Sequence, residues 1–282
     1  MDPATLAHIR DTHQIDLTDH QSVSGGDISQ AFRSGDHFIK TNHPSSLFMF
    51  EAEAFALKTL AKTHTVRIPQ SLANGASETH SYHILEYLPL QPLTAQANVT
   101  LGHQLAQLHQ HTAPEPGFPL NNTIGATPQN NEPRPTWLEF WRDQRLAPLF
   151  QRLAKRGKSF PQSDLLLDNL DQLLPANPEH SLLHGDLWAG NAACLPDHTP
   201  VLFDPASYYG HRETDLAMTQ LFGGFSHQFY QAYESVSPPE PGHELRTELY
   251  NLYHLLNHNL LFGDTYRNQC LSIVQQLSNS IT

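Results

Sequence analysis

The chain has 282 residues and a formal net charge of −12, from 16 lysines and arginines against 28 aspartates and glutamates. An apolar content of 39% is too high for a disordered chain, and the acidic balance argues against nucleic acid as the main ligand, because phosphate neutralisation needs a basic face. No apolar run is long enough to span a bilayer. These properties favour a globular protein whose natural partner is a cation or a metal–nucleotide complex.

Two features indicate the compartment. Cys194 and Cys270 are the only cysteines, too few for a disulfide framework, and the first residues lack the basic and apolar layout of a signal peptide. We therefore expect a cytoplasmic protein that does not bind membranes, and we expect it to be a monomer.

The first third of the chain is predicted to be rich in β-structure. Asp2 is expected to cap a helix that begins at Pro3, and residues 46–63 repeat apolar side chains at helical spacing. Strands are expected at 28–33, at 37–41 and on either side of Asn74-Gly75, the last of them ending at Pro89.

The remainder is predicted to be mainly helical. Helices are expected at 94–111, 136–155, 163–174 and over most of the chain after residue 213, with a short β-rich patch at 181–204. Residues 113–135 are rich in proline, asparagine and glycine, so we expect a long loop of the kind that is often functional. The change of pattern predicts an α+β fold with an N-terminal lobe over residues 1–88 and a C-terminal lobe over residues 89–282.

The chemistry is concentrated in the string His184-Gly185-Asp186-Leu187-Trp188-Ala189-Gly190-Asn191 and in the later Phe203-Asp204. In kinase catalytic loops an asparagine follows the catalytic aspartate by five residues, as Asn191 follows Asp186 here, and a second aspartate further on binds metal. We expect Asp186 to orient the acceptor hydroxyl and to accept its proton, and Asn191 and Asp204 to hold Mg²⁺. His184 is expected to support the loop and not to react.

A kinase also needs a lysine for the α- and β-phosphates of ATP and a helical glutamate that holds this lysine. Lys40 lies on the strand predicted at 37–41. Glu53 is the better candidate for its partner, because Phe50 and Leu57 place it beside the apolar face of the helix, and Glu51 is the alternative.

Two backbone segments are further candidates for nucleotide binding. Gly25 and Gly26 are expected to form a turn before Lys40 whose N–H groups could point at phosphates, although the sequence is neither a Walker loop nor a full G-x-G-x-x-G pattern. The strand that ends near residue 88 is a candidate hinge, where the carbonyl of Glu86 and the N–H of Leu88 would bind adenine.

Other residues are assigned contact or supporting roles. Trp188, two residues after Asp186, is a candidate to stack on a sugar or to contact an amine, with simple packing as the alternative. Asp215 begins a helix and is expected to hold the catalytic loop through backbone N–H groups, or to cap the helix. His254 and His258 have the spacing of a zinc pair but lack the glutamate of that motif, so structural roles are favoured.

Several strings resemble the fructosamine kinase (ketosamine-3-kinase) family. They are Leu-Leu-His-Gly-Asp-Leu-Trp-Ala-Gly-Asn around Asp186, Phe-Asp-Pro-Ala-Ser-Tyr-Tyr-Gly from residue 203, Leu-Phe-Gly-Gly-Phe at 221–225 and Leu-Tyr-His-Leu-Leu-Asn-His at 252–258. The core of His-Gly-Asp, Asn and Asp is shared with aminoglycoside and choline phosphotransferases, whereas the longer strings are more particular to fructosamine kinases. The resemblance covers about residues 20–275.

This resemblance implies a protein-kinase-like fold in two lobes. It also implies ATP-dependent phosphorylation of the sugar 3-hydroxyl of a ketosamine, either a small molecule or a glycated lysine in a protein. Asp186 is implied as the base, Asn191 and Asp204 as Mg²⁺ ligands, Lys40 as a phosphate ligand and Trp188 as a sugar contact. Some relatives have cysteine where this chain has Asp27, so a redox switch in that loop is not expected.

Two alternatives remain beside this interpretation. Another small-molecule kinase, acting on an aminoglycoside or on choline, would use the same residues. A non-catalytic nucleotide-binding protein is disfavoured, because Lys40, Asp186, Asn191 and Asp204 are all present. The preferred sugar and the size of the substrate stay open.

Overall fold

The computed structural model describes residues 1–17, 19–23 and 28–281, which form two compact units. Unit 1 consists of Met1–Ala97 and Asn191–Pro205, and unit 2 of Asn98–Gly190 and Ala206–Thr282. Residues 191–205 belong to unit 1 because Gln91 and Cys194 exchange two backbone hydrogen bonds of 2.9 Å, and Leu202 N donates to Arg67 O. The lobe boundary expected after residue 88 falls inside unit 1 and stays a prediction.

Unit 1 contains a five-stranded antiparallel sheet with the strand order β1-β2-β3-β5-β4. The strands are β1 (Gln21–Val23), β2 (Gln30–Ser34), β3 (His37–Asn42), β4 (Ser71–Ala76) and β5 (Ser81–Glu86). β2 and β3 form the predicted hairpin, which turns at Gly35 with φ of +53°. A second hairpin, of β10 (Ala192–Cys194) and β11 (Pro200–Leu202), completes the unit.

The turn expected at Asn74-Gly75 needs a correction, since both residues lie within β4. The chain turns at residues 77–80, where Ser77 N donates to His80 O at 2.8 Å. Glycine is needed at position 75 because a Cβ there would lie 2.6 Å from the hydroxyl oxygen of Tyr82. An Asn-Gly pair, usually a turn signal, here lets a large ring pass over the neighbouring strand.

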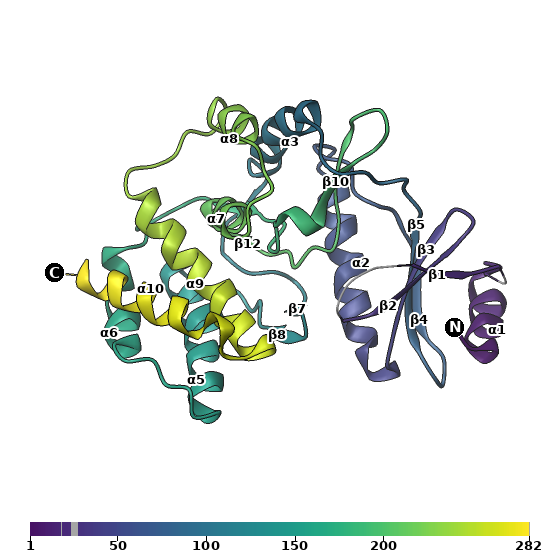
Figure 1. The fold of residues 1–282 in the computed structure, drawn as a ribbon, viewed down its shortest axis with the longest axis horizontal. Helices are drawn as coiled ribbons and strands as arrows, with labels where there is room; N and C mark the ends of the chain where they lie inside the picture. Colours follow the sequence, from purple (N-terminus) through teal and green to yellow (C-terminus); the bar gives the residue numbers. More distant parts are fainter. Residues whose placement is uncertain (18, 24–27, 282) are drawn as a thin grey trace. The chain divides into compact units, whose positions relative to one another are not determined.

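Two helices, α1 (Pro3–His13) and α2 (Leu47–Ala61), cover opposite faces of this sheet (Figure 1). On the α1 side, Ile9 packs into a buried core with Ile39 and Ile84 of the sheet. Side chains alternate along a strand, so an inward Ile39 on this face sends Lys40 to the other face, toward α2. The sheet thereby presents Lys40 to the helix that carries Glu53.

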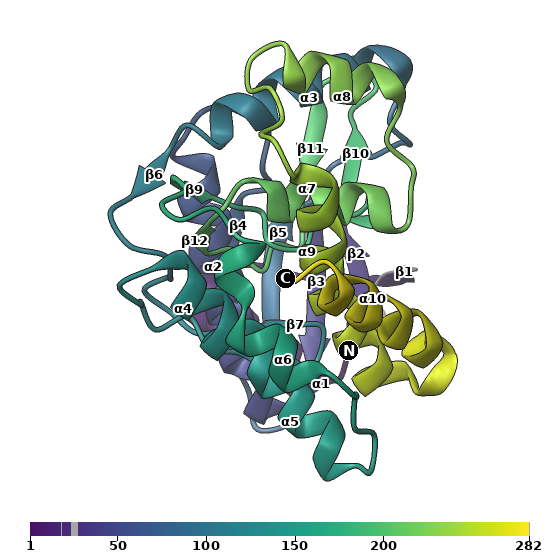
Figure 2. The same ribbon diagram turned by 90° about the vertical axis from the view of Figure 1, so that its left-hand side faces the viewer.

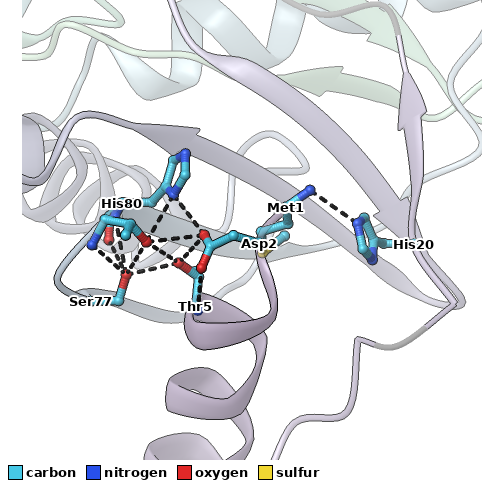
Figure 3. A network of polar contacts seen from close by, with 7 residues as sticks. Met1, Asp2, Thr5, His20, Ser77 and His80 are labelled. Carbon is cyan, nitrogen blue, oxygen red and sulfur yellow. Dashed lines mark hydrogen bonds and ion pairs between the residues drawn. The ribbon is translucent and has the colours of Figure 1, made fainter.

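The start of α1 is fastened to the β4–β5 turn by a network of polar contacts (Figure 3). The Asp2 carboxylate accepts hydrogen bonds from Thr5 N at 3.0 Å and from Thr79 Oγ1 at 3.0 Å, and lies 2.9 Å from Nδ1 of His80. Burial raises the pKa of Asp2, but these hydrogen bonds outweigh burial and hold the pKa well below its usual range. The predicted helix cap therefore also joins segments 77 residues apart.

Unit 2 is mainly helical. Its helices are α3 (Ala95–Leu108, of which the first turn belongs to unit 1), α4 (Trp137–Phe140), the π-helical η2 (Trp141–Leu146), α5 (Ala147–Lys155), α6 (Ser163–Asp168), α7 (Glu213–Leu221), α8 (His227–Glu234), α9 (His243–Phe262) and α10 (Arg267–Asn279). The largely buried α9 packs against α7 and α10 (Figure 2). The helix predicted at 163–174 is interrupted after Asp168 and continues as a short 3₁₀ helix, Leu170–Gln172.

The long loop expected at 113–135 contains regular structure, so this prediction is wrong in part. β6 (Thr112–Ala113) pairs with β9 (His180–Leu182), which pairs with β12 (Tyr209–Gly210). β7 (Asn122–Ile124) and β8 (Thr127–Gln129) form a hairpin that turns at Gly125 with φ of +61°. Three-residue strands are too short to show alternation, and their buried positions are largely filled by polar residues.

In the part of the chain that the structure describes, every helix is too short or too polar to cross a membrane.

Candidate active site

Lys40 is the centre of an ion-pair cluster in unit 1. Its Nζ lies 2.6 Å from Oε1 of Glu53 and also contacts Oδ1 of Asp204. The side chains of Lys40 and Glu53 are 13% and 12% exposed, whereas Glu51 is exposed to solvent. The structure therefore pairs Lys40 with Glu53 and not with Glu51.

The second carboxylate oxygen of Glu53 contacts a histidine that sequence reasoning missed. Oε2 of Glu53 lies 3.0 Å from Nδ1 of His83, and Nε2 of His83 lies 2.9 Å from Oγ of Ser71. His83 is the cross-strand partner of Lys40 on β5. The strand register that brings it to Glu53 has no signal in the local sequence.

Both members of the Lys40–Glu53 pair are held in their charged forms. Burial raises the pKa of Glu53, but the Lys40 ammonium and His83 outweigh burial and lower this pKa to about 2. Burial likewise favours the neutral amine of Lys40, but Asp204 and Glu53 outweigh it and raise the pKa of Lys40 above its usual range. At neutral pH Lys40 is therefore an ammonium and Glu53 a carboxylate.

Asn191 and Asp204 are brought together by the hairpin of β10 and β11. Asn191 directly precedes β10, Asp204 follows β11, and Phe203 N donates to Asn191 O at 3.1 Å. The Asn191 side-chain amide lies 3.4 Å from Asp204 O, and the Asp204 carboxylate is 40% exposed. An amide oxygen and a carboxylate are donors that Mg²⁺ prefers, and Mg²⁺ sites commonly use only one or two protein ligands beside phosphates and water. These residues therefore fit Mg²⁺.

In unit 2 the His184-Gly185-Asp186 loop follows β9, and its backbone is hydrogen-bonded to Asp215 at the start of α7. The Asp215 carboxylate accepts hydrogen bonds from His184 N at 2.8 Å and from Gly185 N at 2.9 Å. Gly185 has φ of +83°, and a Cβ there would lie 2.2 Å from Ala206 O. His184 is fully buried, and its Nδ1 accepts a bond from Asp186 N at 3.3 Å. Asp215 and His184 thus fix the backbone that carries Asp186.

Asp215 has another partner, His109, which directly follows α3. Nε2 of His109 lies 3.1 Å from Asp215, and Nδ1 lies 2.8 Å from the hydroxyl of Tyr233. Burial raises the pKa of Asp215, but His109 and the N–H of Gly185 outweigh burial and lower it. No local sequence pattern indicates this role of His109, because its partner lies 106 residues away in the chain.

Trp188 begins a row of aromatic side chains. Trp188 is 38% exposed, and its ring meets Phe222 edge-on, with 6.2 Å between centroids. Phe222 is 5.1 Å from the ring of His258 on α9. Gly190 is required beside Trp188, because a Cβ there would lie 2.2 Å from the indole. The sequence indicated only Trp188 as a contact residue, and His258 was assigned a structural role.

The predicted nucleotide-binding segments, the Gly25–Gly26 turn and the hinge at Glu86 and Leu88, stay predictions. Gly25 and Gly26 lie outside the described residues. The Glu86 carboxylate binds Arg67 at 2.6 Å and accepts from Gln70 N at 2.6 Å, so its side chain anchors the end of β5. The carbonyl of Leu88 accepts from Leu90 N at 2.8 Å.

Among the described residues, no three or more His, Cys, Asp or Glu side chains are arranged so that they could hold a metal ion. Nδ1 of His258 is bonded to His254 O at 2.8 Å. Burial lowers the pKa of His254 to about 3.

Together, a β-rich unit with a lysine–glutamate pair and a helical unit with a His-Gly-Asp loop define a protein-kinase-like phosphotransferase. The crystal structure of the aminoglycoside phosphotransferase APH(4)-Ia matches with a TM-score of 0.63, covering 99% of this chain and 99% of that chain. At 15% identity this match shows the fold alone. The prediction of an α+β, protein-kinase-like fold is confirmed.

The chain belongs to the fructosamine kinase family, whose model matches residues 1–280. A protein from Synechocystis sp. that is named a probable ketoamine kinase is 42% identical over 266 residues, 92% of this chain and 90% of the relative. The crystal structure of a protein from Haemophilus somnus assigned as a fructosamine-3-kinase matches with a TM-score of 0.89 at 28% identity, covering 97% of this chain and 96% of that chain. The resemblance found in the sequence is confirmed, and the protein is a kinase.

Proposed function

We propose that this protein transfers the γ-phosphoryl group of ATP to the sugar 3-hydroxyl of a ketosamine. The names of two relatives, a ketoamine kinase and a fructosamine-3-kinase, support the substrate class and the position of the phosphate. Candidate substrates are fructosyl or ribulosyl adducts, either of small amines or of lysine side chains. We also infer a cytoplasmic location, in keeping with two buried cysteines that form no disulfide.

One structural observation carries the proposal, namely the position of Lys40 between Glu53 and Asp204. Phosphoryl transfer depends mainly on positioning and on charge stabilisation, and a fixed ammonium supplies both at the α- and β-phosphates. Glu53 holds the ammonium in place and keeps it charged. A lysine with only a surface role would not need a buried carboxylate partner.

The remaining nucleotide contacts come from unit 1. Asn191 and Asp204 would hold Mg²⁺, which neutralises phosphate charge when bound. Backbone N–H groups of Gly25 and Gly26 would face the phosphates. The carbonyl of Glu86 and the N–H of Leu88 would bind the adenine edge.

The acceptor contacts come from unit 2. The 3-hydroxyl oxygen forms the new bond to the γ-phosphorus, the bond from that phosphorus to the bridging oxygen of ADP breaks, and the hydroxyl proton passes to Asp186. His184 and Asp215 keep the backbone of Asp186 in place through the hydrogen bonds described above. Trp188, braced by Phe222, provides the aromatic face for the sugar.

A substrate panel tests the proposal. Purified protein with Mg–ATP should release ADP with fructosyl-lysine or ribulosyl-lysine, and should not do so with kanamycin or choline. Asp186→Asn should abolish this turnover while ATP binding persists. Turnover of kanamycin or choline in place of the ketosamines would favour an aminoglycoside- or choline-type kinase instead.

A further inference from the structure

The β7–β8 hairpin of unit 2 is held by buried side-chain amides. Asn122 and Gln129 are cross-strand partners at its open end, and they are only 6% and 2% exposed. Because they face each other, Nε2 of Gln129 donates to Oδ1 of Asn122 at 2.7 Å. An amide pair buried this deeply must satisfy all its polar atoms, which fixes its geometry.

Gln129 connects the hairpin to two other segments. Its Oε1 accepts from the hydroxyl of Tyr253 on α9 at 2.7 Å, and its Nε2 also donates to Ala206 O at 3.2 Å. Asn122 adds a parallel bond, from Nδ2 to Ser207 O at 3.0 Å. The amide pair therefore holds the two carbonyl groups of Ala206 and Ser207.

The same dipeptide holds the catalytic loop from its other side. Ala206 N donates to His184 O at 3.0 Å, and Oγ of Ser207 donates to the same carbonyl at 3.4 Å. The carbonyl of Ala206 is also the group that leaves no room for a Cβ at Gly185. A shift of residues 206–207 would therefore be transmitted to the residues that precede Asp186.

A buried arginine fixes the chain after the hairpin. Arg145, in the π-helical segment η2, donates to Asn130 O at 2.7 Å and to Oδ1 of Asn131 at 2.7 Å. Its guanidinium lies 4.1 Å from the ring centroid of Tyr208, and Leu183 N donates to the Tyr208 carbonyl at 3.0 Å. π-Helical turns are frequent at functional sites. Arg145 thus ties the hairpin segment to the strand that leads into the catalytic loop.

We propose that Gln129 is a positioning residue for phosphoryl transfer, acting through Ala206 and Ser207 on the loop that carries Asp186. The segment 113–135 is then a fixed support beneath the catalytic loop and not a lid. A misplacement of about 1 Å in a reacting group can lower a rate by about a hundredfold, so this support bears on turnover. The rate effect rests on the proposed function, whereas the effect on the loop does not.

The test compares Gln129→Met with two controls in the full chain. Methionine has a similar shape and removes all three hydrogen bonds. Thr127→Val changes a buried neighbour on β8 whose Oγ1 makes no hydrogen bond within the described residues. Leu277→Ala, at a buried position on α10, lowers stability through an element outside the hairpin. All are assayed at a temperature at which circular dichroism shows each to be folded.

Hydrogen exchange followed by mass spectrometry is the first readout, since it needs no substrate. Gln129→Met should speed exchange of the peptide that contains residues 183–187, and neither control should do so. With a ketosamine substrate, Gln129→Met should lower kcat by about tenfold or more with KM for ATP within about twofold of the wild-type value.

Three results would overturn the proposal: exchange at 183–187 that matches Leu277→Ala, a kcat loss no greater than that of Leu277→Ala, or a loss confined to KM for ATP. Faster exchange in a protein that phosphorylates no ketosamine would retain the loop support and reject the proposed function.

Discussion

The Lys40–Glu53 pair offers a prediction whose size follows from the structure. Glu53→Gln keeps the shape of the side chain and removes its charge, which leaves Lys40 with Asp204 as its carboxylate partner. The pKa of Glu53 falls from 4.5 to about 2 in the folded protein. A difference of that size corresponds to roughly 3 kcal/mol of stability at neutral pH. Glu53 is only 12% exposed, so solvent screens little of this.

The pH dependence follows from the direction of the shift. Because the folded pKa lies below the unfolded one, the contribution of Glu53 is fully present above about pH 4.5 and is lost as the pH falls toward 2. Urea unfolding of wild type and Glu53→Gln should therefore differ by roughly 3 kcal/mol at pH 7, and by about 1 kcal/mol less at pH 3.5.

Glu51→Gln is the matched control, since it makes the same change two residues away at an exposed position on α2. It should alter the free energy of unfolding by no more than about 0.5 kcal/mol. If Glu53→Gln behaves like Glu51→Gln, or if its effect is the same at both pH values, the charged-cluster argument is refuted.

Three other predictions concern the parts that hold the site. Asp2→Ala should lower the free energy of unfolding by at least about 1 kcal/mol, because it removes the helix cap and the contact with the β4–β5 turn. An unchanged melting temperature would contradict this. His211 and His254 have pKa values lowered to about 3, mainly by burial. Each should therefore lower the free energy of unfolding by about 1.4 kcal/mol for every pH unit below its unfolded pKa near 6.5. In urea unfolding, His254→Gln should reduce the loss of stability between pH 7 and 5, and an unchanged pH dependence would refute the assignment. Gly185→Ala should nearly abolish kcat, because its Cβ would meet Ala206 O, whereas Gly157→Ala, with φ of +75° and open space around it, should cost only about 1 kcal/mol of stability and leave kcat unchanged.

The parts of the site that are local in the chain could be predicted from the sequence. The His-Gly-Asp string, the five-residue step from Asp186 to Asn191 and the following Asp204 predict a kinase catalytic loop from one stretch of the chain. Helical spacing from Phe50 and Leu57 favoured Glu53 over Glu51, and the ion pair with Lys40 has formed on that side.

The rest depends on contacts between segments far apart in the chain. His109 meets Asp215 across 106 residues, and Lys40 meets Asp204 across 164. Neither contact has a local signal in the sequence, because each depends on the register of a sheet or on the packing of helices. The hairpin within 113–135 was missed for a related reason, since polar amides occupy positions where a pattern of apolar residues would have been visible.

The position of the phosphate on the product tests the central claim most directly. After reaction of fructosyl-lysine with Mg–ATP, phosphorus–proton NMR of the product should place the phosphate on O3 of the sugar, and the Asp186→Asn protein should form none of this product. A phosphate on another oxygen, or an unchanged yield from Asp186→Asn, would contradict the account.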